Sequence, residues 1–477
     1  MSNIFRNIGW LLGSRGINAA FSLVYLGLAT RTLGIEGFGA FAMILVLAQA
    51  VAGIASFNTW QMLVKWGHFD GDAAPATGFA MALDLASMAG GILLALAAGF
   101  TAALWLPLPP GSGALIVALS AAALLALRST PTGILRLHDR YDLSTAAEAS
   151  LPLTRAAGAV AAAIWVPTLA GFVAAWALAE LICAAAYWLL AARFVSVRLS
   201  DVSLARFPSR YPGIWPFVVA TSLSRTLAVV SKQVLLLGVG AFGGAALAGG
   251  YRVASQLGQA LVQLGEAVSR AIYPEFVRSA DSSAAVTRRM VALAALTGAL
   301  SVAAAVMGGR FAIEWIAGAA FAFAYPALVI LSFAGAIELS AASWEALLVA
   351  RQRAGRALAM RLGPLVLAFS AMPWAIAAYG LIGVAACILA ASVLTFAGLA
   401  HAVSATRGQS VEAPQGRVTI DAETMHSYLT PRIGRSRPDC HFDILAEAAC
   451  PVRPDPYLVR AAPPIETVSR RPQLRVI

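Results

Sequence analysis

Three apolar stretches of the sequence carry polar side chains at the spacing of a single helix face. Residues that are three, four or seven positions apart share one face of an α-helix, so each stretch predicts one polar stripe on an otherwise apolar helix. The stripes consist of Arg15, Asn18, Ser22 and Tyr25; of Ser222, Arg225 and Lys232; and of Arg252, Gln256, Gln259, Gln263, Glu266 and Arg270. Guanidinium groups held in this way suit the binding of a phosphate or another anion.

Charged residues outside the stripes also lie within apolar stretches. They are the cations Arg128 and Arg155 and the anions Asp84, Glu180, Glu338 and Glu345. With the stripes they make seven cations and five anions, so the predicted interior is positive. A charge at the centre of a bilayer costs about 2.5 to 3.5 kcal/mol, and such groups therefore face a partner or a hydrated cavity. Either the charges pair between helices, or the stripes line a hydrated cationic cavity, which is the interpretation that three aligned stripes favour.

The candidate ligands of an anion in this cavity come from the stripes and from one further arginine. They are Arg15, Asn18, Arg128, Arg225, Lys232, Arg252, Gln259 and Arg270. Asp84, Glu180 and Glu338 are the candidates for ion coupling, because a desolvated carboxylate can take up and release a proton within the membrane. Whether the ion is H+ or Na+ stays open. No cofactor, catalytic residue or metal site is predicted, since the four cysteines lack CxxC or histidine spacing.

The composition shows what kind of element must position these residues. Of the 477 residues, 60% are apolar and 12% are charged, whereas soluble domains carry about 25% charge. The mean hydropathy of +0.77 agrees, and together these values exclude a soluble globular protein. The net charge of +11 alone would also fit a nucleic-acid-binding protein, but the apolar content favours a membrane and no nucleic acid is expected.

Twelve apolar stretches are long enough to span a bilayer as helices. They lie near residues 11–30, 38–64, 76–106, 113–135, 146–166, 168–192, 214–237, 245–271, 290–309, 325–350, 363–379 and 381–403. The connectors that follow even-numbered spans hold fourteen Lys and Arg residues, and those that follow odd-numbered spans hold only Arg31 and Arg310. Because cytoplasmic loops collect basic residues, both termini are predicted to be cytoplasmic.

The spans divide the chain into four predicted regions. Residues 1–192 form an N-terminal six-helix lobe, 193–213 a cytoplasmic linker and 214–403 a C-terminal six-helix lobe. Residues 404–477 hold nine of the 23 prolines and no apolar run that could cross a bilayer, so they are predicted to be a disordered cytoplasmic tail. The first apolar stretch is interrupted by polar residues and is expected to remain as an uncleaved first span.

The connectors on the outer side are short, and this bears on the class of function. The longest lies between Gly309 and Tyr325 and is expected to dip into the bilayer as a partial helix. A lipid-dependent glycosyltransferase, polymerase or ligase needs a sizeable loop that carries catalytic groups. The sequence therefore argues against an enzyme.

An internal repeat links the two predicted lobes. The segment Gly34-Ile35-Glu36-Gly37-Phe38-Gly39-Ala40-Phe41 has a counterpart in Gly243-Gly244-Ala245-Ala246-Leu247-Ala248-Gly249-Gly250-Tyr251. Each segment joins a stripe-bearing helix to the next helix through glycines and an aromatic residue. This pattern fits two related halves with a binding site at their interface.

At these residues the sequence resembles the polysaccharide flippase family, the O-antigen and exopolysaccharide exporters of the superfamily that includes MATE drug antiporters and lipid II flippases. The resemblance covers about residues 1–403 and rests on the order and spacing of several motifs. They are Arg31-Thr32-Leu33-Gly34-Ile35-Glu36-Gly37-Phe38-Gly39, Gly250-Tyr251-Arg252-Val253-Ala254, Tyr273-Pro274-Glu275-Phe276 and the segment Ala317 to Leu328.

The resemblance implies an all-α integral membrane protein with twelve transmembrane helices in two MATE-like lobes. It implies a flippase that moves an undecaprenyl-pyrophosphate-linked oligosaccharide across the bacterial inner membrane by alternating access, with basic residues on the pyrophosphate and an ion gradient driving return. The lipid-linked oligosaccharide and the bilayer are then the partners, and a polysaccharide polymerase or glycosyltransferases are candidate protein partners. Where the family often carries Asp in the seventh span, this chain has Lys232-Gln233, which favours anion binding there.

Two other functions fit parts of the same sequence. A drug or metabolite antiporter of the MATE type shares the fold, but a cation exporter would need an acidic cavity, whereas these apolar stretches carry more cations than anions. A membrane scaffold without transport activity would need no aligned stripes. The flippase is therefore the favoured interpretation.

Overall fold

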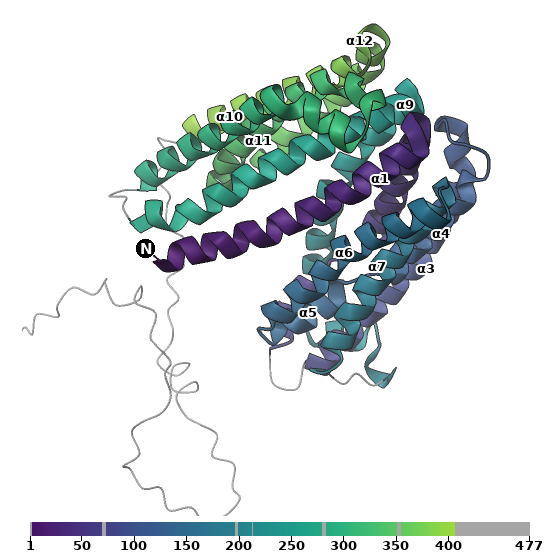
Figure 1. Cartoon of the computed structure of the whole chain (residues 1–477). Coiled ribbons are helices and arrows are strands. Elements are labelled where there is room, and N and C mark those ends of the chain that lie inside the picture. The colour runs from purple at the N-terminus through teal and green to yellow at the C-terminus, as the bar shows by residue number, and fades with distance from the viewer. Residues whose placement is uncertain are drawn as a thin grey trace, which may run out of the picture. The chain divides into compact units, whose positions relative to one another are not determined.

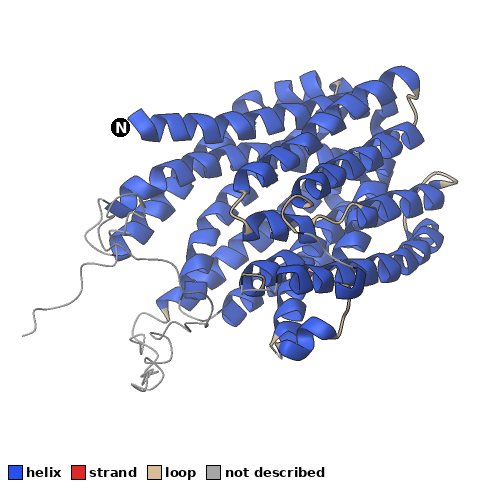
Figure 2. Cartoon of the chain, turned by 90° about the horizontal axis from the view of Figure 1, so that it is seen from below, coloured by secondary structure: helices blue, strands red, loops and turns tan. Residues whose placement is uncertain are grey.

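A computed structural model of the chain describes residues 2–68, 73–195, 199–211, 213–278, 283–350 and 354–405 (Figure 1). Within these ranges it leaves the side chains of residues 2–20, 199, 228, 232, 264–278, 283–291, 343, 346–347, 349–350 and 354 undescribed. The described residues form helices joined by loops and contain no strand (Figure 2). The predicted all-α fold is therefore confirmed, whereas the predicted tail from residue 406 onward lies outside the described residues.

The helices follow one another with short connectors. They are α1 (Ser2–Ala55), α2 (Thr59–Trp66), α3 (Ala73–Trp105), α4 (Ser112–Leu125), α5 (Ser129–Leu137), α6 (Tyr141–Trp165), α7 (Leu169–Ala191), η1 (Leu199–Asp201), α8 (Arg206–Arg210), α9 (Ile214–Arg278), α10 (Ser283–Ile316), η2 (Ala319–Ala324), α11 (Tyr325–Ala350) and α12 (Ala354–Ser404). Eight helical segments among the described residues are long and apolar enough to cross a membrane. The partial helix expected between Gly309 and Tyr325 corresponds to η2.

Three of the long helices contain a glycine whose backbone is not helical. Gly34 in α1, Gly244 in α9 and Gly380 in α12 have φ angles of 71°, 87° and 56°. This left-handed region is accessible to glycine at little cost, which explains why glycine stands at the kink in each case. The kinks coincide with predicted connectors between spans, although the repeat aligned Gly34 with Gly243 and the structure has the second kink one residue later.

Two predicted spans are discontinuous in the structure. The span predicted at 38–64 ends at Ala55 and resumes as α2, and the span predicted at 113–135 ends at Leu125 and resumes as α5. Side chains from other helices accept the amide hydrogen bonds at the first break, since Ser222 Oγ accepts from the Asn58 amide at 2.9 Å and Ser129 Oγ accepts from the Trp60 amide at 3.1 Å. Hydropathy alone did not reveal these breaks because both flanking segments are apolar.

Helices α1 and α9 form the most extensive contact between elements in the described part of the chain. Helices α3, α4, α6 and α7 also pack against α1, whereas α10, α11 and α12 pack against α9 (Figure 1). One large buried apolar cluster includes side chains from both groups of helices. The segments of the three predicted stripes therefore lie on two neighbouring elements, one on α1 and two on α9.

The closest approach of α1 to α9 depends on two glycines that lie five residues after the kinks. A Cβ atom on Gly39 would overlap the carbonyl group of Ala245. A Cβ atom on Gly249 would lie 2.9 Å from the carbonyl oxygen of Ile35. Each helix thus presents a glycine to the backbone of the other, as small residues do at close helix crossings in membranes.

Substitution Gly39→Ala should reduce stability, because the added methyl group meets backbone atoms that cannot rotate away. We expect a loss of about 1 to 3 kcal/mol, seen as a lower thermal unfolding midpoint in detergent or as reduced accumulation. Gly90→Ala in α3 is the matched control, since nothing lies within 4 Å of the added atom. There alanine should raise helix stability by about 1 kcal/mol, and equal midpoints for the two variants would contradict the close crossing.

Candidate functional site

Hydrogen bonds between polar side chains and backbone groups connect α1, and the segment that follows it, to α9. Their donor–acceptor distances range from 2.9 to 3.3 Å. The pairs are Tyr25 hydroxyl to Gln256 Oε1, Gln233 Nε2 to Gln49 Oε1, Thr226 hydroxyl to the Gly53 carbonyl, and the Asn58 amide to Ser222 Oγ. Three members of the predicted stripes, Tyr25, Ser222 and Gln256, therefore face the contact between these helices.

An ion-paired triad lies among α5, α6 and α7. Glu180 on α7 accepts a hydrogen bond from Arg128 Nη2 at 3.0 Å through one oxygen and pairs with Arg155 Nη2 through the other. Arg128 also donates to Cys183 Sγ at 2.9 Å. The guanidinium of Arg155 lies 3.8 Å from the centre of the Trp176 ring, where the cation is stabilised by the face of the indole.

The triad brings together one predicted anion ligand, Arg128, and one predicted ion-coupling residue, Glu180. A carboxylate held by two guanidinium groups has its charge compensated twice over, so the triad carries one excess positive charge. Arg155 was recognised as an interior cation from the sequence but was not assigned to the site. Its partner Trp176 could not be found without the fold.

Arg225 on α9 adds a further positive charge near the triad. Its side chain is exposed, and its guanidinium is close enough to that of Arg128 for the two charges to repel each other. No anion pairs with Arg225 among the described side chains. Such a group suits an anion that bridges α9 and the triad.

A second set of predicted residues gathers between α9, α11 and α12. Glu338 accepts a hydrogen bond from the Ser392 hydroxyl at 3.1 Å. The buried hydroxyl of Tyr251 lies within electrostatic reach of both Glu338 and Arg252. Arg252 is half-buried and Gln259 is exposed.

The remaining predicted residues divide into two groups. The side chains of Arg15, Asn18, Lys232, Arg270 and Glu266 lie outside the described residues, so their place in the site stays a prediction. Glu345 forms an ion pair of 3.2 Å with Arg361, a residue of the predicted cytoplasmic connector. Asp84 is buried in α3 and accepts a hydrogen bond from the Thr130 hydroxyl at 2.6 Å.

Aromatic side chains close the contact between the helix groups near the Gly34 kink. The Phe38 ring packs edge-on against Phe321 of η2 at 5.9 Å, and Phe41 packs against Trp176 at 6.0 Å. Arg31 donates hydrogen bonds to the carbonyl oxygens of Trp315 and Ile316 at the end of α10. A cation at a helix C-terminus is favoured by the exposed carbonyls, so Arg31 ties α1 to α10 at this end.

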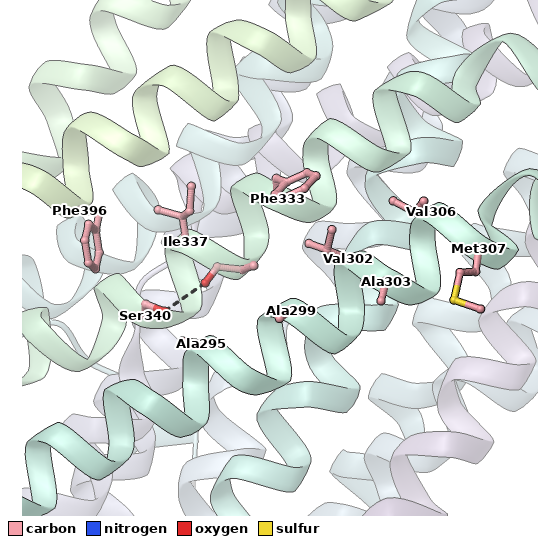
Figure 3. A pocket seen from close by; sticks show the side chains of 11 residues that line it. Ala295, Ala299, Val302, Ala303, Val306, Met307, Phe333, Ile337, Ser340 and Phe396 are labelled. Atoms are coloured by element: carbon pink, nitrogen blue, oxygen red, sulfur yellow. Dashed lines mark hydrogen bonds between the residues drawn. The ribbon is translucent and has the colours of Figure 1, made fainter.

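An apolar pocket of about 580 Å³ lies between α10, α11 and α12 (Figure 3). Alanines, Val302, Met307, Phe333 and Phe396 line it, and its one hydroxyl, on Ser340, donates to the Ala336 carbonyl at 3.3 Å. None of the predicted polar site residues lines this pocket. Its chemistry suits a hydrocarbon rather than an anion.

Comparison with known proteins matches the model of a family described as "Polysaccharide biosynthesis protein" to residues 4–280, which is more than half of the chain. A second model, described as a periplasmic binding protein domain, matches residues 375–463, and its described part is the end of α12. An inner membrane protein of Escherichia coli K12, YghQ, is 28% identical over 299 residues, which cover 58% of this chain and 80% of the relative.

Solved structures of similar fold are transporters and flippases. The lipid II flippase MurJ in an inward closed conformation has a TM-score of 0.65 at 11% identity, covering 83% of this chain and 87% of that one. An inward-facing multidrug resistance MATE transporter of the MOP superfamily has a TM-score of 0.61 at 16% identity, covering 84% and 96%. At these identities the likeness establishes the fold, which is that of the MATE and MurJ proteins.

Glu180 is the only anion of the triad, and its removal should lower the stability of the protein. Glu180→Gln should destabilise the protein by about 3 kcal/mol, because it leaves two largely buried guanidinium groups without a counter-charge. The change should appear as a lower unfolding midpoint in detergent.

Glu314→Gln is the control, since Glu314 pairs with Arg310 on an exposed helix face and the same substitution there should have no measurable effect. Equal responses of the two variants would show that the triad is not a coupled ionic unit.

Proposed function

Because the chain belongs to the polysaccharide biosynthesis protein family, we propose that it is a flippase that moves an undecaprenyl-pyrophosphate-linked oligosaccharide across the bacterial inner membrane. The observation that carries this proposal is the excess positive charge formed by the Arg128–Glu180–Arg155 triad and Arg225. The fold shared with a lipid II flippase and the similarity to an inner membrane protein support the cargo class and the location.

The proposed architecture has twelve membrane crossings with both termini in the cytoplasm. Three of the eight candidate spans are 46 to 50 residues long and contain a kink. At 1.5 Å per residue such a segment is about 70 Å long, more than twice the apolar thickness of a bilayer, so each has room for two crossings. With α6, which is 25 residues long, this makes twelve.

The packing supports two lobes, residues 1–192 and 214–403, joined by a linker at 193–213. Helices α3, α4, α6 and α7 pack against α1, helices α10 to α12 pack against α9, and α1 contacts α9. Residues 404–477 form a cytoplasmic tail in this proposal. A binding site at the interface of two related halves is the usual arrangement in transporters of this kind.

The positive charges of the site favour binding of the pyrophosphate group of the cargo. A pyrophosphate carries several negative charges and accepts charge-assisted hydrogen bonds, which are about twice as strong as neutral ones. Arg225 has no described counter-ion and its charge repels that of Arg128, so a pyrophosphate between them would relieve their repulsion. Arg15, Asn18, Lys232, Arg252, Gln259 and Arg270 are proposed to complete the cationic wall.

Alternating access follows from the contacts that close one end. The aromatic cluster at Phe38, Phe41 and Phe321 and the Arg31 contact with α10 lie at the end that the connector charges assign to the outer side. Opening this end requires these contacts to separate while the other end closes. Uptake of an ion by Asp84 or Glu338 is proposed to couple the two states, whereas Glu180 is already paired.

A drug antiporter of MATE type is the second candidate, because the fold is shared. Such a protein exports cations and needs an acidic site. The described groups near the α1–α9 contact are more positive than negative, which favours an anionic cargo. The similar solved structures are transporters and flippases, and an enzymatic activity is not proposed.

The export of glycan should depend on the charge of Arg225. Arg225→Gln should reduce export at least about tenfold at normal protein level, because one charge-assisted contact is worth about 1.5 to 3 kcal/mol. Arg225→Lys keeps the charge and should retain part of the activity. The measurement is complementation of a strain that lacks its own flippase, with membrane abundance quantified in parallel.

Arg193→Gln serves as the matched control, since Arg193 is exposed in the segment after α7 and lies outside the site. It should export normally. If Arg225→Gln also exported normally, or failed only because the protein no longer accumulated, the arginine would be a structural contact and the proposed anion site would be wrong.

A further inference from the structure

A second buried polar cluster, separate from the cationic triad, lies where the two discontinuous helices meet. It contains an amide, a carboxylate and four hydroxyl groups from α2, α3, α5, α9 and the break before α2. All six residues are buried, with relative exposures from 0% to 8%: Asn58, Thr59, Asp84, Ser129, Thr130 and Ser222. Polar groups at such depth need partners for every donor and acceptor.

The hydroxyl groups of Thr59 and Thr130 form a series of hydrogen bonds that ends at Asp84. The Thr130 hydroxyl donates to Asp84 Oδ2 at 2.6 Å, so its oxygen is free to accept only. The Thr59 hydroxyl, 3.1 Å from Thr130 Oγ1, is then the donor of that pair. Through this series of hydrogen bonds, one oxygen of the Asp84 carboxylate accepts one hydrogen bond.

Two oxygen atoms in the cluster have no partner among the described residues. They are Asp84 Oδ1 and Asn58 Oδ1, and both are shielded from solvent. Among the described residues Asp84 forms no ion pair, and its one side-chain hydrogen bond comes from Thr130. A buried carboxylate with a single hydrogen bond and no counter-charge is costly, so Asp84 must take up either a proton or a cation.

The cluster lies at the breaks in the two helices. Residues 56–58 and 126–128 are not helical, and unwound segments of this kind present carbonyl oxygens to cations in transporters with discontinuous helices. The helix starts at Thr59 and Ser129 favour the charged form of a nearby carboxylate over its acid. Both features favour a bound cation over a proton as the compensating charge.

We propose that this cluster is a binding site for a monovalent cation of the size of Na+, with Asp84 Oδ1 and Asn58 Oδ1 as its side-chain ligands. A single carboxylate balances a single positive charge, which argues against a divalent ion. Amide, hydroxyl and carboxylate oxygens are the ligands that hard cations take. A water molecule would satisfy the two oxygen atoms but would leave the charge of Asp84 uncompensated.

A role of this ion in transport rests on the proposed flippase function. Binding of the ion can occur without that function. The site is connected to α9 by a hydrogen bond. Ser222 Oγ on α9 accepts from the backbone N–H of Asn58 at 2.9 Å. A change in the position of α9 would therefore alter the ligand that Asn58 offers. The cation site and the cargo site are linked through the same helix.

The test is a Na+ titration of the purified full-length protein in detergent, without cargo. The thermal unfolding midpoint should rise saturably by about 2 °C or more when NaCl replaces choline chloride at constant ionic strength and pH. Asp84→Asn should abolish this rise while leaving the protein folded. Asn58→Ala should raise the half-maximal Na+ concentration at least about tenfold.

Glu148→Gln is the matched control, because it removes a carboxylate that also accepts a hydrogen bond from a hydroxyl group, that of Tyr187, and has no proposed role in ion binding; it should keep the full Na+ response. A wild-type midpoint that depends on pH through Asp84 but not on Na+ would overturn the proposal in favour of a proton. A full Na+ response in Asp84→Asn would also overturn it. Because no glycan is present, a failure of the flippase assay leaves this result unaffected.

Discussion

The cost of removing charged side chains from water governs how this helical bundle is built. Glu180 lies between Arg128 and Arg155, and Trp176 covers one of the two guanidinium groups. One anion for two cations leaves a positive remainder, and Arg225 adds to it from the neighbouring helix. A bundle that had only to be stable could use apolar residues here, since buried ion pairs rarely contribute more than a well-packed apolar core. The retained excess charge is therefore best explained by an anionic ligand.

In the alternating access that we propose, the site opens and closes at the contact between α1 and α9. Both helices kink at a glycine and then approach each other through a second glycine, at Gly39 and Gly249. At these positions backbone meets backbone, with no large side chain between the two helices. The aromatic rings at Phe38 and Phe321 and the Arg31 contact with α10 close one end. The polar cluster around Asp84 lies on α3 and at the helix breaks, where a bound ion would stabilise one position of α9 through Ser222.

Much of this could be predicted from the sequence because membrane helices carry strong local signals. Apolar length gave the helices, and glycine at Gly34 and Gly380 marked the kinks, since both signals act within a few residues. The breaks after Ala55 and Leu125 were missed, because apolar residues flank them and only a hydroxyl from a distant helix makes the unwound backbone stable. Residue spacing placed Tyr25, Ser222 and Gln256 on interacting faces. The pairing of Glu180 with Arg155 was missed, because charge partners on different helices leave no trace in periodicity.

The central claim is that the cationic group between the two halves recognises a pyrophosphate. The most direct measurement compares the binding of undecaprenyl pyrophosphate and undecaprenol to the purified protein in detergent, at several salt concentrations. The account predicts that the pyrophosphate form binds at least about tenfold more tightly and that this preference shrinks as salt increases. Equal affinity for the two lipids, independent of salt, would show that the protein holds only the hydrocarbon chain and would contradict the account.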